Sequence, residues 1–378
     1  DAQRLLEQCP DPTNRPPLFG LPIGVKDIFH VDGFITRAGS QLPPEILQGD
    51  EAKSVTILRQ AGVLILGKTV TTEFAYFAPG PTRNPHNPAH TPGGSSSGSA
   101  AAVAAGLCPF AFGTQTIGSI NRPAAFCGVV GFKPSYGRIS TTGVIPLSHS
   151  LDHVGFFTND AAGAELMAGF LCQDWRGPVQ SARKPVLGIP EGPYLQHAEP
   201  EGLAHFRATC DHLTEAGFIV KAIDPMSDFT EIDRQHRRLM AGEAARFHAQ
   251  WFAQYEALYH PKTVALIRDG QAYSDDDIVI AQIYKTTLRK RLAGLMDQHG
   301  LDLWISPSAT GPAPKGLDGT GNPIMNLPWT NAGLPTLTIP SGFSQSGLPI
   351  GLQLTGRWQD DEALFAHGKV IEKTLGHE

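Results

Sequence analysis

The sequence predicts an α/β protein in which helices cover both faces of a β-sheet. Three stretches carry this prediction, because each has the apolar spacing of a helix and is followed by a short apolar run typical of a strand. These stretches are residues 54–68, 201–220 and 288–305. They alternate along the chain without an internal repeat of fixed period.

The individual elements follow from these patterns in chain order. In the first stretch SVTILRQAG is amphipathic and runs into the apolar strand VLIL at Val63–Leu66; in the second EGLAHFRATCDHLTEAG precedes FIV. In the third LRKRLAGLMDQHG leads into LDLWI. The Pro- and Gly-rich segment 306–354 ends in the apolar runs LPTLTIPSG and GLPIGLQLTG, which we expect to return to the sheet as two strands.

We interpret residues 1–378 as one domain with a weak internal boundary at Asp174–Lys184, where DWRGPVQSARK separates an Ala-, Gly- and Ser-rich half from a more charged one. Residues 1–172 hold the catalytic motifs, and residues 185–378 complete the sheet and the substrate pocket. MAGEAARFHAQWF and SPSATGPAPKG are candidate pocket walls from this second half. The chain begins at Asp1 without an initiator Met or a readable signal peptide, so we expect its N-terminus to be incomplete.

Bulk composition argues against several classes of partner. Lys and Arg total 30 against 36 Asp and Glu, a net charge of −6, and no basic block is present, so no nucleic-acid partner is expected. The uncharged stretch from Thr91 to Asn121 is too polar and too broken to span a membrane and is expected to lie at the centre of the fold. Five widely spaced cysteines without a CxxC pair indicate a reducing, cytoplasmic location and no zinc site.

Three segments carry the residues suited to chemistry: GVKD at Gly24–Asp27, GGSSSGSAAAVAAG at Gly93–Gly106, and GTQTIGSINRPAAFCG at Gly113–Gly128. Lys26 ends the apolar strand LPIGV, and burial there disfavours the ammonium form, which makes the side chain a candidate base. The plainer interpretation of this lysine is a salt bridge or a side chain that reaches out to solvent.

Ser119 follows a glycine and is flanked by apolar residues. The backbone N–H groups of the three preceding residues, Thr116, Ile117 and Gly118, are positioned to converge on a carbonyl oxygen, as in an oxyanion hole. The plainer interpretation is a turn serine. The serines that precede AAAVAAG are also typical of a helix N-cap, for which Ser97 or Ser99 is the expected capping residue.

Two short motif matches fail their context. Gly62–Thr69 fits the phosphate-binding loop pattern, but its variable positions are Val, Leu, Ile and Leu, which predict a buried strand. Gly94–Gly98 fits the nucleophile elbow with Ser96 as nucleophile, yet no apolar strand precedes it. Neither match is therefore assigned a function.

Taken together, the three segments resemble the amidase signature family in their order and spacing, and the resemblance covers nearly the whole chain. It implies a large mixed central sheet and a hydrolase acting on C–N bonds of linear amides, without metal or organic cofactor. Carried over by motif, Ser119 is the nucleophile, Ser95 the bridging serine with a cis peptide bond, and Lys26 the base. Ser96 has a supporting role. The implied partner is a small amide, and a homodimer is left open.

The chain departs from the common family pattern at three positions. Many members have a Gly pair before the nucleophile and an acidic residue shortly upstream, where this chain has Ile117-Gly118 and Gln115. Arg122 lies three residues after the nucleophile, as in malonamidase-like members, rather than two as in amidotransferase subunits. We expect Arg122 to bind a substrate carboxylate, with an internal ion pair to Asp27 or Asp152 as the alternative.

Two other functions are kept beside the amidase. One is the catalytic A component of a tRNA-dependent amidotransferase, against which the arginine placement and the shorter C-terminal region count. The other is a catalytically silent binding module that keeps the fold, against which the presence of all three triad residues counts.

Overall fold

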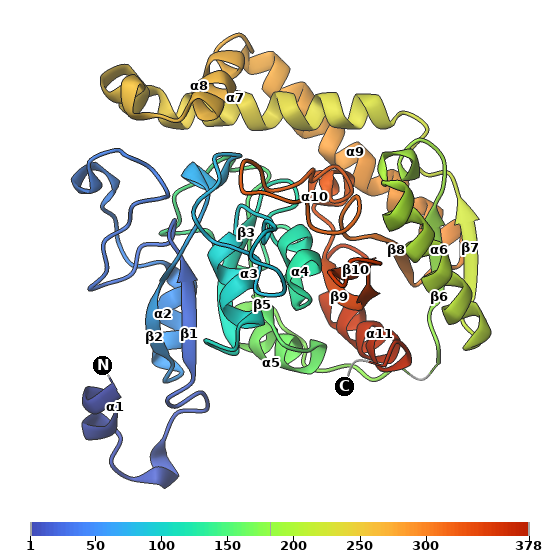
Figure 1. Ribbon diagram of the computed structural model, residues 1–378, viewed down its shortest axis with the longest axis horizontal. Coiled ribbons are helices and arrows are strands. Elements are labelled where there is room, and N and C mark those ends of the chain that lie inside the picture. Colours follow the sequence, from blue (N-terminus) through green and yellow to red (C-terminus); the bar gives the residue numbers. More distant parts are fainter. Residues whose placement is uncertain (1, 182, 377–378) are drawn as a thin grey trace.

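The computed structural model describes residues 2–181 and 183–376, and a mixed ten-stranded sheet runs through them (Figure 1). The sheet order is β2-β1-β3-β5-β4-β9-β10-β8-β6-β7. The strands are β1 (Pro22–Lys26), β2 (Leu64–Thr69), β3 (Phe110–Gln115), β4 (Val130–Lys133), β5 (His153–Thr158), β6 (Val186–Pro190), β7 (Ile219–Ile223), β8 (Leu303–Pro307), β9 (Thr336–Phe343) and β10 (Pro349–Thr355).

Each half of the chain supplies one contiguous half of the sheet. Strands β1 to β5 occupy one side and β6 to β10 the other, and among the described strands the ladder between β4 and β9 joins them. Pairs β1·β2, β1·β3, β6·β7 and β6·β8 are parallel, and the central pairs are antiparallel. The predicted mixed central sheet is confirmed.

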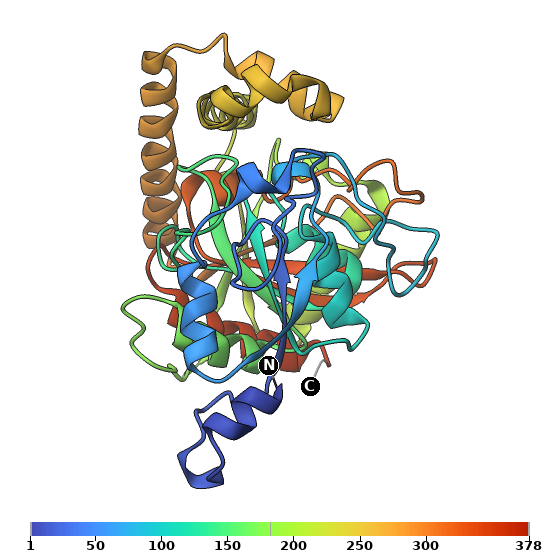
Figure 2. The ribbon, with the colours of Figure 1, turned by 90° about the vertical axis from the view of Figure 1, so that its left-hand side faces the viewer.

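Helices cover both faces of this sheet, as predicted. They are α1 (Ala2–Gln8), α2 (Lys53–Gln60), α3 (Ser97–Ala104), α4 (Asn121–Cys127), α5 (Ala161–Leu171), α6 (Pro200–Glu215), α7 (Phe229–Tyr255), α8 (Pro261–Gly270), α9 (Asp275–His299), α10 (Leu327–Ala332) and α11 (Asp361–Thr374). Helix α5 packs against α2 and α11, whereas α3 packs against α4. In Figure 2 α2 and α3 lie on opposite sides of the sheet.

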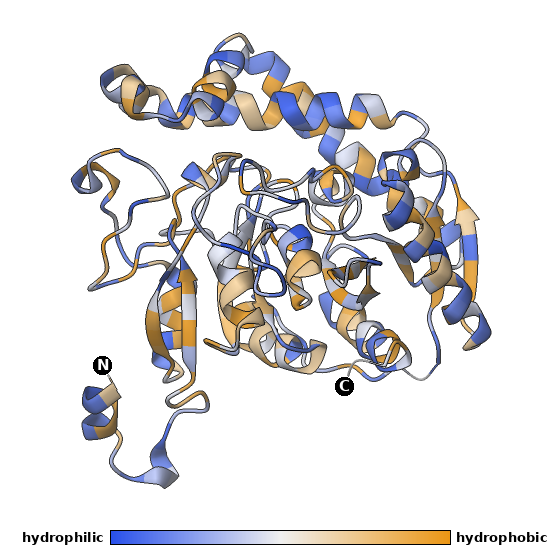
Figure 3. Cartoon of the chain, in the orientation of Figure 1, coloured by the Kyte–Doolittle hydropathy of each residue, from blue (hydrophilic) through white to orange (hydrophobic). Residues whose placement is uncertain are grey.

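Helices α7, α8 and α9 form a separate layer, here called the helical arm. In Figures 1 and 2 α7 and α8 lie across one edge of the core and α9 returns toward it. Hydropathy follows this division (Figure 3), since α3 is mainly apolar in colour while hydrophilic and hydrophobic segments alternate along the arm. An apolar surface is expected for a core helix such as α3, and alternating hydropathy is expected for arm helices that bury one face.

The three predicted helix–strand units are confirmed as α2 with β2, α6 with β7, and α9 with β8. Helix α9 begins earlier than the spacing indicated. Ser274 is its N-cap residue and forms a capping box with Asp277, so the helix starts at Asp275. The segment that resembled a phosphate-binding loop is a strand, as predicted, but it is not buried. Strand β2 is at the sheet edge, and Leu66 is 58% exposed.

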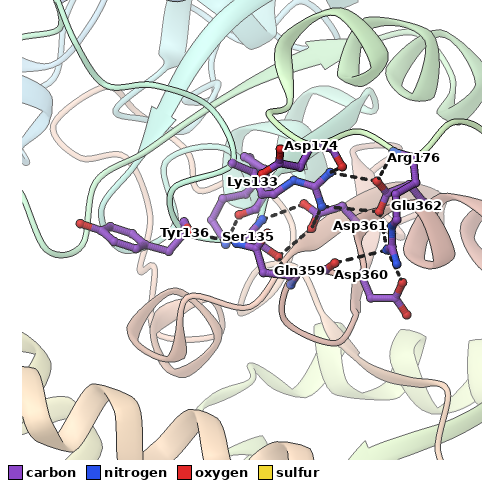
Figure 4. Close-up of polar contacts among 11 residues, drawn as sticks. Lys133, Ser135, Tyr136, Asp174, Arg176, Gln359, Asp360, Asp361 and Glu362 are labelled. Carbon is purple, nitrogen blue, oxygen red and sulfur yellow. Dashed lines mark hydrogen bonds and ion pairs between the residues drawn. The ribbon is translucent and has the colours of Figure 1, made fainter.

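The expected boundary near 174–184 is irregular in its described part, residues 174–181 and 183–184, while Ala182 lies outside the described residues. This segment is tied to the C-terminal helix by a buried polar cluster (Figure 4). Glu362 accepts hydrogen bonds from Arg138 at 2.9 Å and from Arg176 at 2.8 Å. Asp361 accepts bonds from the backbone N–H and the hydroxyl of Ser135. The cluster therefore joins the two halves beside the β4–β9 ladder.

Candidate active site

The candidate site lies where the parallel strands β1 and β3 end. Lys26 is the last residue of β1, and Thr114 is one residue before the end of β3, so both side chains come to the same edge of the sheet. The Nζ atom of Lys26 lies 2.7 Å from Ser95 Oγ and 2.8 Å from Thr114 Oγ1. Two hydroxyls distant in sequence thus converge on one amine.

Lys26 is completely buried. Burial lowers the pKa of its ammonium group well below the ordinary value, and the charge of Asp152 opposes this shift. Among the described residues no ion pair includes Lys26, so the salt-bridge interpretation of this lysine is wrong. Its polar contacts are the two hydroxyls, which suit a neutral amine.

The serine segment places Ser95 at a cis peptide bond with Gly94, as the family resemblance implies. Ser96 lies at the N-cap of α3, but its hydroxyl donates to the carbonyl of Thr114 in β3 rather than capping the helix. The expected capping by Ser97 or Ser99 is wrong. Their hydroxyls donate to backbone carbonyls of neighbouring segments instead, at Val70 and Phe112.

Ser119 lies in the turn between β3 and α4. Gln115 holds this turn, because its Oε1 accepts from the backbone N–H of Ile120 at 2.8 Å and of Asn121 at 3.0 Å. The side chain at the position of the family's acidic residue therefore serves as a helix cap through its amide. Ser119 is 8% exposed, and no hydrogen bond among the described residues joins its hydroxyl to Ser95.

Thr116, Ile117 and Ser119 line the candidate pocket, and Gly118 lies between the last two in the chain. In the described chain neither the Ile117 nor the Gly118 N–H donates to a protein acceptor, while the Ile117 carbonyl accepts from Thr330 Oγ1 at 2.6 Å. A Cβ added to Gly118 would lie 2.2 Å from Asn326 Oδ1, so this position requires glycine. The hydroxyl of Thr116 donates to Asp152 at 2.5 Å. The turn thus presents unused donors next to Ser119.

Arg122 is buried in the first turn of α4, and burial lowers its pKa to about 9. Its Nη2 donates to the carbonyl of Gly94 at 2.5 Å and to Thr320 Oγ1 at 3.1 Å, while Nε and Nη1 have no partner. The alternative of an internal ion pair is wrong, because Asp27 pairs with Lys68 and Asp152 accepts from Thr116 and two backbone N–H groups.

These groups line a narrow pocket. Its walls include Ser95, Ser119 and Arg122, the loop residues 75–77, and Leu147, with Thr320 and Pro323 from the second half. The expectation that the second half supplies most of the wall is wrong for this pocket. Of the two segments proposed for the wall, SPSATGPAPKG contributes nothing here, and MAGEAARFHAQWF contributes only to a neighbouring cavity.

Sequence reasoning missed two residues of the site, Thr114 and Thr320, and named Asp152 only as a possible ion-pair partner of Arg122 and not as the acceptor for Thr116. Thr114 could have been predicted from the sequence. Side chains alternate between the two faces of a strand, and β3 is the neighbour of β1, which carries Lys26. Thr320 could not have been predicted, since it is 198 residues from Arg122 in the chain. Among the described residues no group of three or more His, Cys, Asp or Glu side chains is placed to hold a metal ion.

A family model described as Amidase matches residues 1–365. The chain belongs to the amidase family. It is 34% identical to an amidase of Pseudomonas putida, with 94% of this chain and 82% of the relative aligned. It is 32% identical to the A component of the glutamyl-tRNA(Gln) amidotransferase of Synechococcus sp. (strain WH7803), with 97% of this chain and 85% of the relative aligned.

A solved amidase structure superimposes on this amidase-family chain with a TM-score of 0.90. The two are 32% identical, and the match covers 99% of this chain and 89% of the other. The family match confirms the family predicted from the sequence. Members of this family are hydrolases that act on C–N bonds. No helix in residues 2–181 or 183–376 is long and apolar enough to cross a membrane.

Proposed function

We propose that the protein is an amidase that hydrolyses the C–N bond of a small linear amide to a carboxylic acid and ammonia or an amine, through an acyl-enzyme on Ser119. The observation that carries this proposal is the contact of 2.7 Å between the buried Lys26 amine and Ser95. A lysine with a depressed pKa beside a hydroxyl is a base able to act near neutral pH.

In the first step Ser119 Oγ attacks the amide carbonyl and gives its proton to Ser95, which gives its own to Lys26. The C–N bond then breaks as the proton returns through Ser95 to the leaving nitrogen, and an ester bond to Ser119 remains. Water attacks this ester with the same proton transfers and releases the acid. Hydrogen bonds between catalytic side chains are often long when no substrate is bound. This accounts for the missing hydrogen bond between the hydroxyls of Ser95 and Ser119.

The carbonyl oxygen gains negative charge in this step, and donors that are already oriented stabilise it. The unused N–H groups of Ile117 and Gly118, together with that of Thr116, are assigned to this role. The Ile117 side chain replaces the glycine common in the family, but its backbone N–H is retained.

Arg122 is assigned to a carboxylate or similar acceptor on the acyl part of the substrate. A buried guanidinium with two unpaired nitrogens beside the pocket is unfavourable unless a ligand satisfies them. This supports small acidic amides as the preferred substrate class. The proposed location is the cytoplasm, on the cysteine pattern of the sequence.

The alternative function is that of the A component of an amidotransferase, because relatives of that name align over most of the chain. The arginine at the third position after Ser119 favours the free amidase. A catalytically silent module is disfavoured, since the lysine and both serines line or adjoin one pocket.

The test is release of ammonia from small primary amides by the purified protein, together with trapping of a covalent acyl-enzyme by mass spectrometry. Ser119→Ala is expected to lower kcat by at least about 10³-fold with the fold intact. Ser97→Ala is a matched control, because that hydroxyl contacts the Val70 carbonyl and not Lys26. A folded Ser119→Ala variant with near wild-type turnover would overturn the proposal.

A further inference from the structure

Two cavities meet at the candidate active site. The pocket at Ser119 is the smaller one, with a volume of about 10 Å³, so the acyl part proposed to bind beside Arg122 must be short. A second cavity of about 540 Å³ adjoins it, and Ala75 and Leu147 line both. A volume of this size is typical of small-molecule sites.

Lys26 links the two cavities. One of its hydroxyl partners, Ser95, lines the small pocket, and the other, Thr114, lines the large cavity. The large cavity therefore adjoins the Lys26 end of the proposed relay through Thr114, whereas Lys26, Ser95 and Ser119 do not line it. Arg122 lines only the small pocket.

The walls of the large cavity are mainly apolar. Phe247 and Trp251 come from α7 of the helical arm, and Ile28, Leu47 and Val144 come from the core. Polar groups, among them His30, Asp50 and His149, also line it. A lining with two aromatic and several aliphatic side chains suits a flat or branched apolar group.

Carboxylates hold the arm in place over this cavity. Glu243 of α7 accepts hydrogen bonds from Ser148 Oγ and Ser150 Oγ, both at 2.5 Å, in the loop that carries Leu147. Glu73, in the same 3₁₀ turn as Ala75, accepts from Thr263 Oγ1 of α8 at 2.5 Å. The residues shared by the two cavities are thus fixed to the arm, which makes the large cavity a built part of the site.

We propose that this cavity is the leaving-group subsite, and that it accepts the aromatic or branched apolar amine of an N-substituted amide. The inference rests on the proposed function. In that reaction the proton returns from Lys26 through Ser95 to the leaving nitrogen, so the amine part lies on the Lys26 side and the acyl part on the Arg122 side. When the C–N bond breaks, the protonated nitrogen departs as a neutral amine into the large cavity.

The test compares a primary amide with the N-phenyl amide of the same acid. In Trp251→Ala, kcat/KM for the N-phenyl amide is expected to fall about 10-fold or more, with the primary amide nearly unchanged. Tyr255→Ala, on the same helix outside the cavity, is the matched control and is expected to leave both substrates unaffected. Aniline should inhibit wild-type hydrolysis of the N-phenyl amide, and less so in Trp251→Ala.

Trp251 also packs against Phe74, so a second variant guards against loss of fold. Val144→Phe enlarges another side chain that lines the cavity and is expected to reduce N-phenyl amide hydrolysis selectively. If kcat/KM falls equally for both amides in the two variants, or if neither variant changes the ratio of the two kcat/KM values, the subsite assignment is wrong while the amidase proposal stands. If the wild-type protein hydrolyses neither substrate, the amidase proposal itself fails.

Discussion

The amine of Lys26 contacts Thr114 at 2.8 Å, almost as closely as it contacts Ser95. A neutral amine has one lone pair and two N–H groups. If one N–H donates to the threonine hydroxyl, the lone pair is left to face Ser95. Thr114 is therefore a positioning residue for Lys26 within the proposed relay.

Thr114→Val keeps the shape of this side chain and removes its hydroxyl, so kcat is expected to fall about 10- to 100-fold because Lys26 loses an orienting acceptor. Thr114→Ser restores the hydroxyl and should recover most of the rate. The measurement is the pH–rate profile of both variants. A merely structural threonine would change thermal stability without moving the midpoint of the profile.

Activity is expected to rise with pH and then level off. Burial lowers the pKa of Lys26, so the neutral amine that accepts the proton becomes populated below the free-lysine value of about 10.4. The rising limb should be lost in Lys26→Ala. A profile that keeps the same midpoint in that variant would assign the titration to another group, such as Asp152, whose pKa burial raises to about 6.

Arg122→Ala is expected to lower kcat/KM for acidic amides by the equivalent of about 2 to 4 kcal/mol, and to affect neutral amides little. Arg122→Lys keeps the charge but not the planar fork, so it should recover only part of the loss. Steady-state kinetics on both amide classes decide the matter. Equal losses on both classes, or a collapse of thermal stability, would assign Arg122 a structural role through Gly94 and Thr320.

Gly118→Ala is expected to reduce kcat strongly, because the new Cβ would lie 2.2 Å from Asn326 Oδ1 and push the backbone donor out of place. Overpacking of this kind costs about 1 to 3 kcal/mol of stability as well. Gly294→Ala in α9 is a matched control, since no atom lies within 4 Å of its added Cβ. Unchanged kinetics in Gly118→Ala would exclude this backbone from the oxyanion site.

The buried cluster at Glu362 should contribute to stability in a pH-dependent way. Although burial acts to raise the pKa of this carboxyl, hydrogen bonds from Arg176 and Arg138 outweigh it and hold the value at about 2. A depressed carboxyl pKa stabilises the fold above the unfolded value of about 4.3, and the contribution is lost as pH falls toward 2.

Glu362→Gln is accordingly expected to lower the free energy of unfolding by about 3 kcal/mol at pH 7, with a smaller difference at pH 3. Denaturant titration at the two pH values measures this. Asp360→Asn is the control, because its pair with Arg176 is exposed and is worth about 1 kcal/mol at most. A difference that does not depend on pH would mean that packing, not charge, holds the cluster.

The sequence predicted the helix–strand units well, because each is a local pattern of apolar spacing. The candidate triad came from short motifs whose order is characteristic of one family. What failed depended on neighbours distant in the chain. Ser97 and Ser99 have the composition of helix caps, but their hydroxyls reach carbonyls of adjacent segments, at Val70 and Phe112, that only the folded chain brings near.

The surroundings of Arg122 could not be predicted for the same reason. Nothing local indicates that Thr320 would lie beside it, or that Asp27 would instead pair with Lys68. Burial of β2 was misjudged because an apolar run does not reveal whether a strand is central or at an edge.

The ladder between β4 and β9 has only three residue pairs, from Gly131 with Thr338 to Lys133 with Thr336. The proposed triad lies in the first half of the chain and Trp251 in the second. An amide long enough to reach from Ser119 to Trp251 would contact both halves at once, whereas a primary amide would meet the second half only through Thr320 and Pro323. A bound substrate that contacts both halves stabilises their association. Longer substrates should therefore protect the protein from unfolding more than a primary amide does.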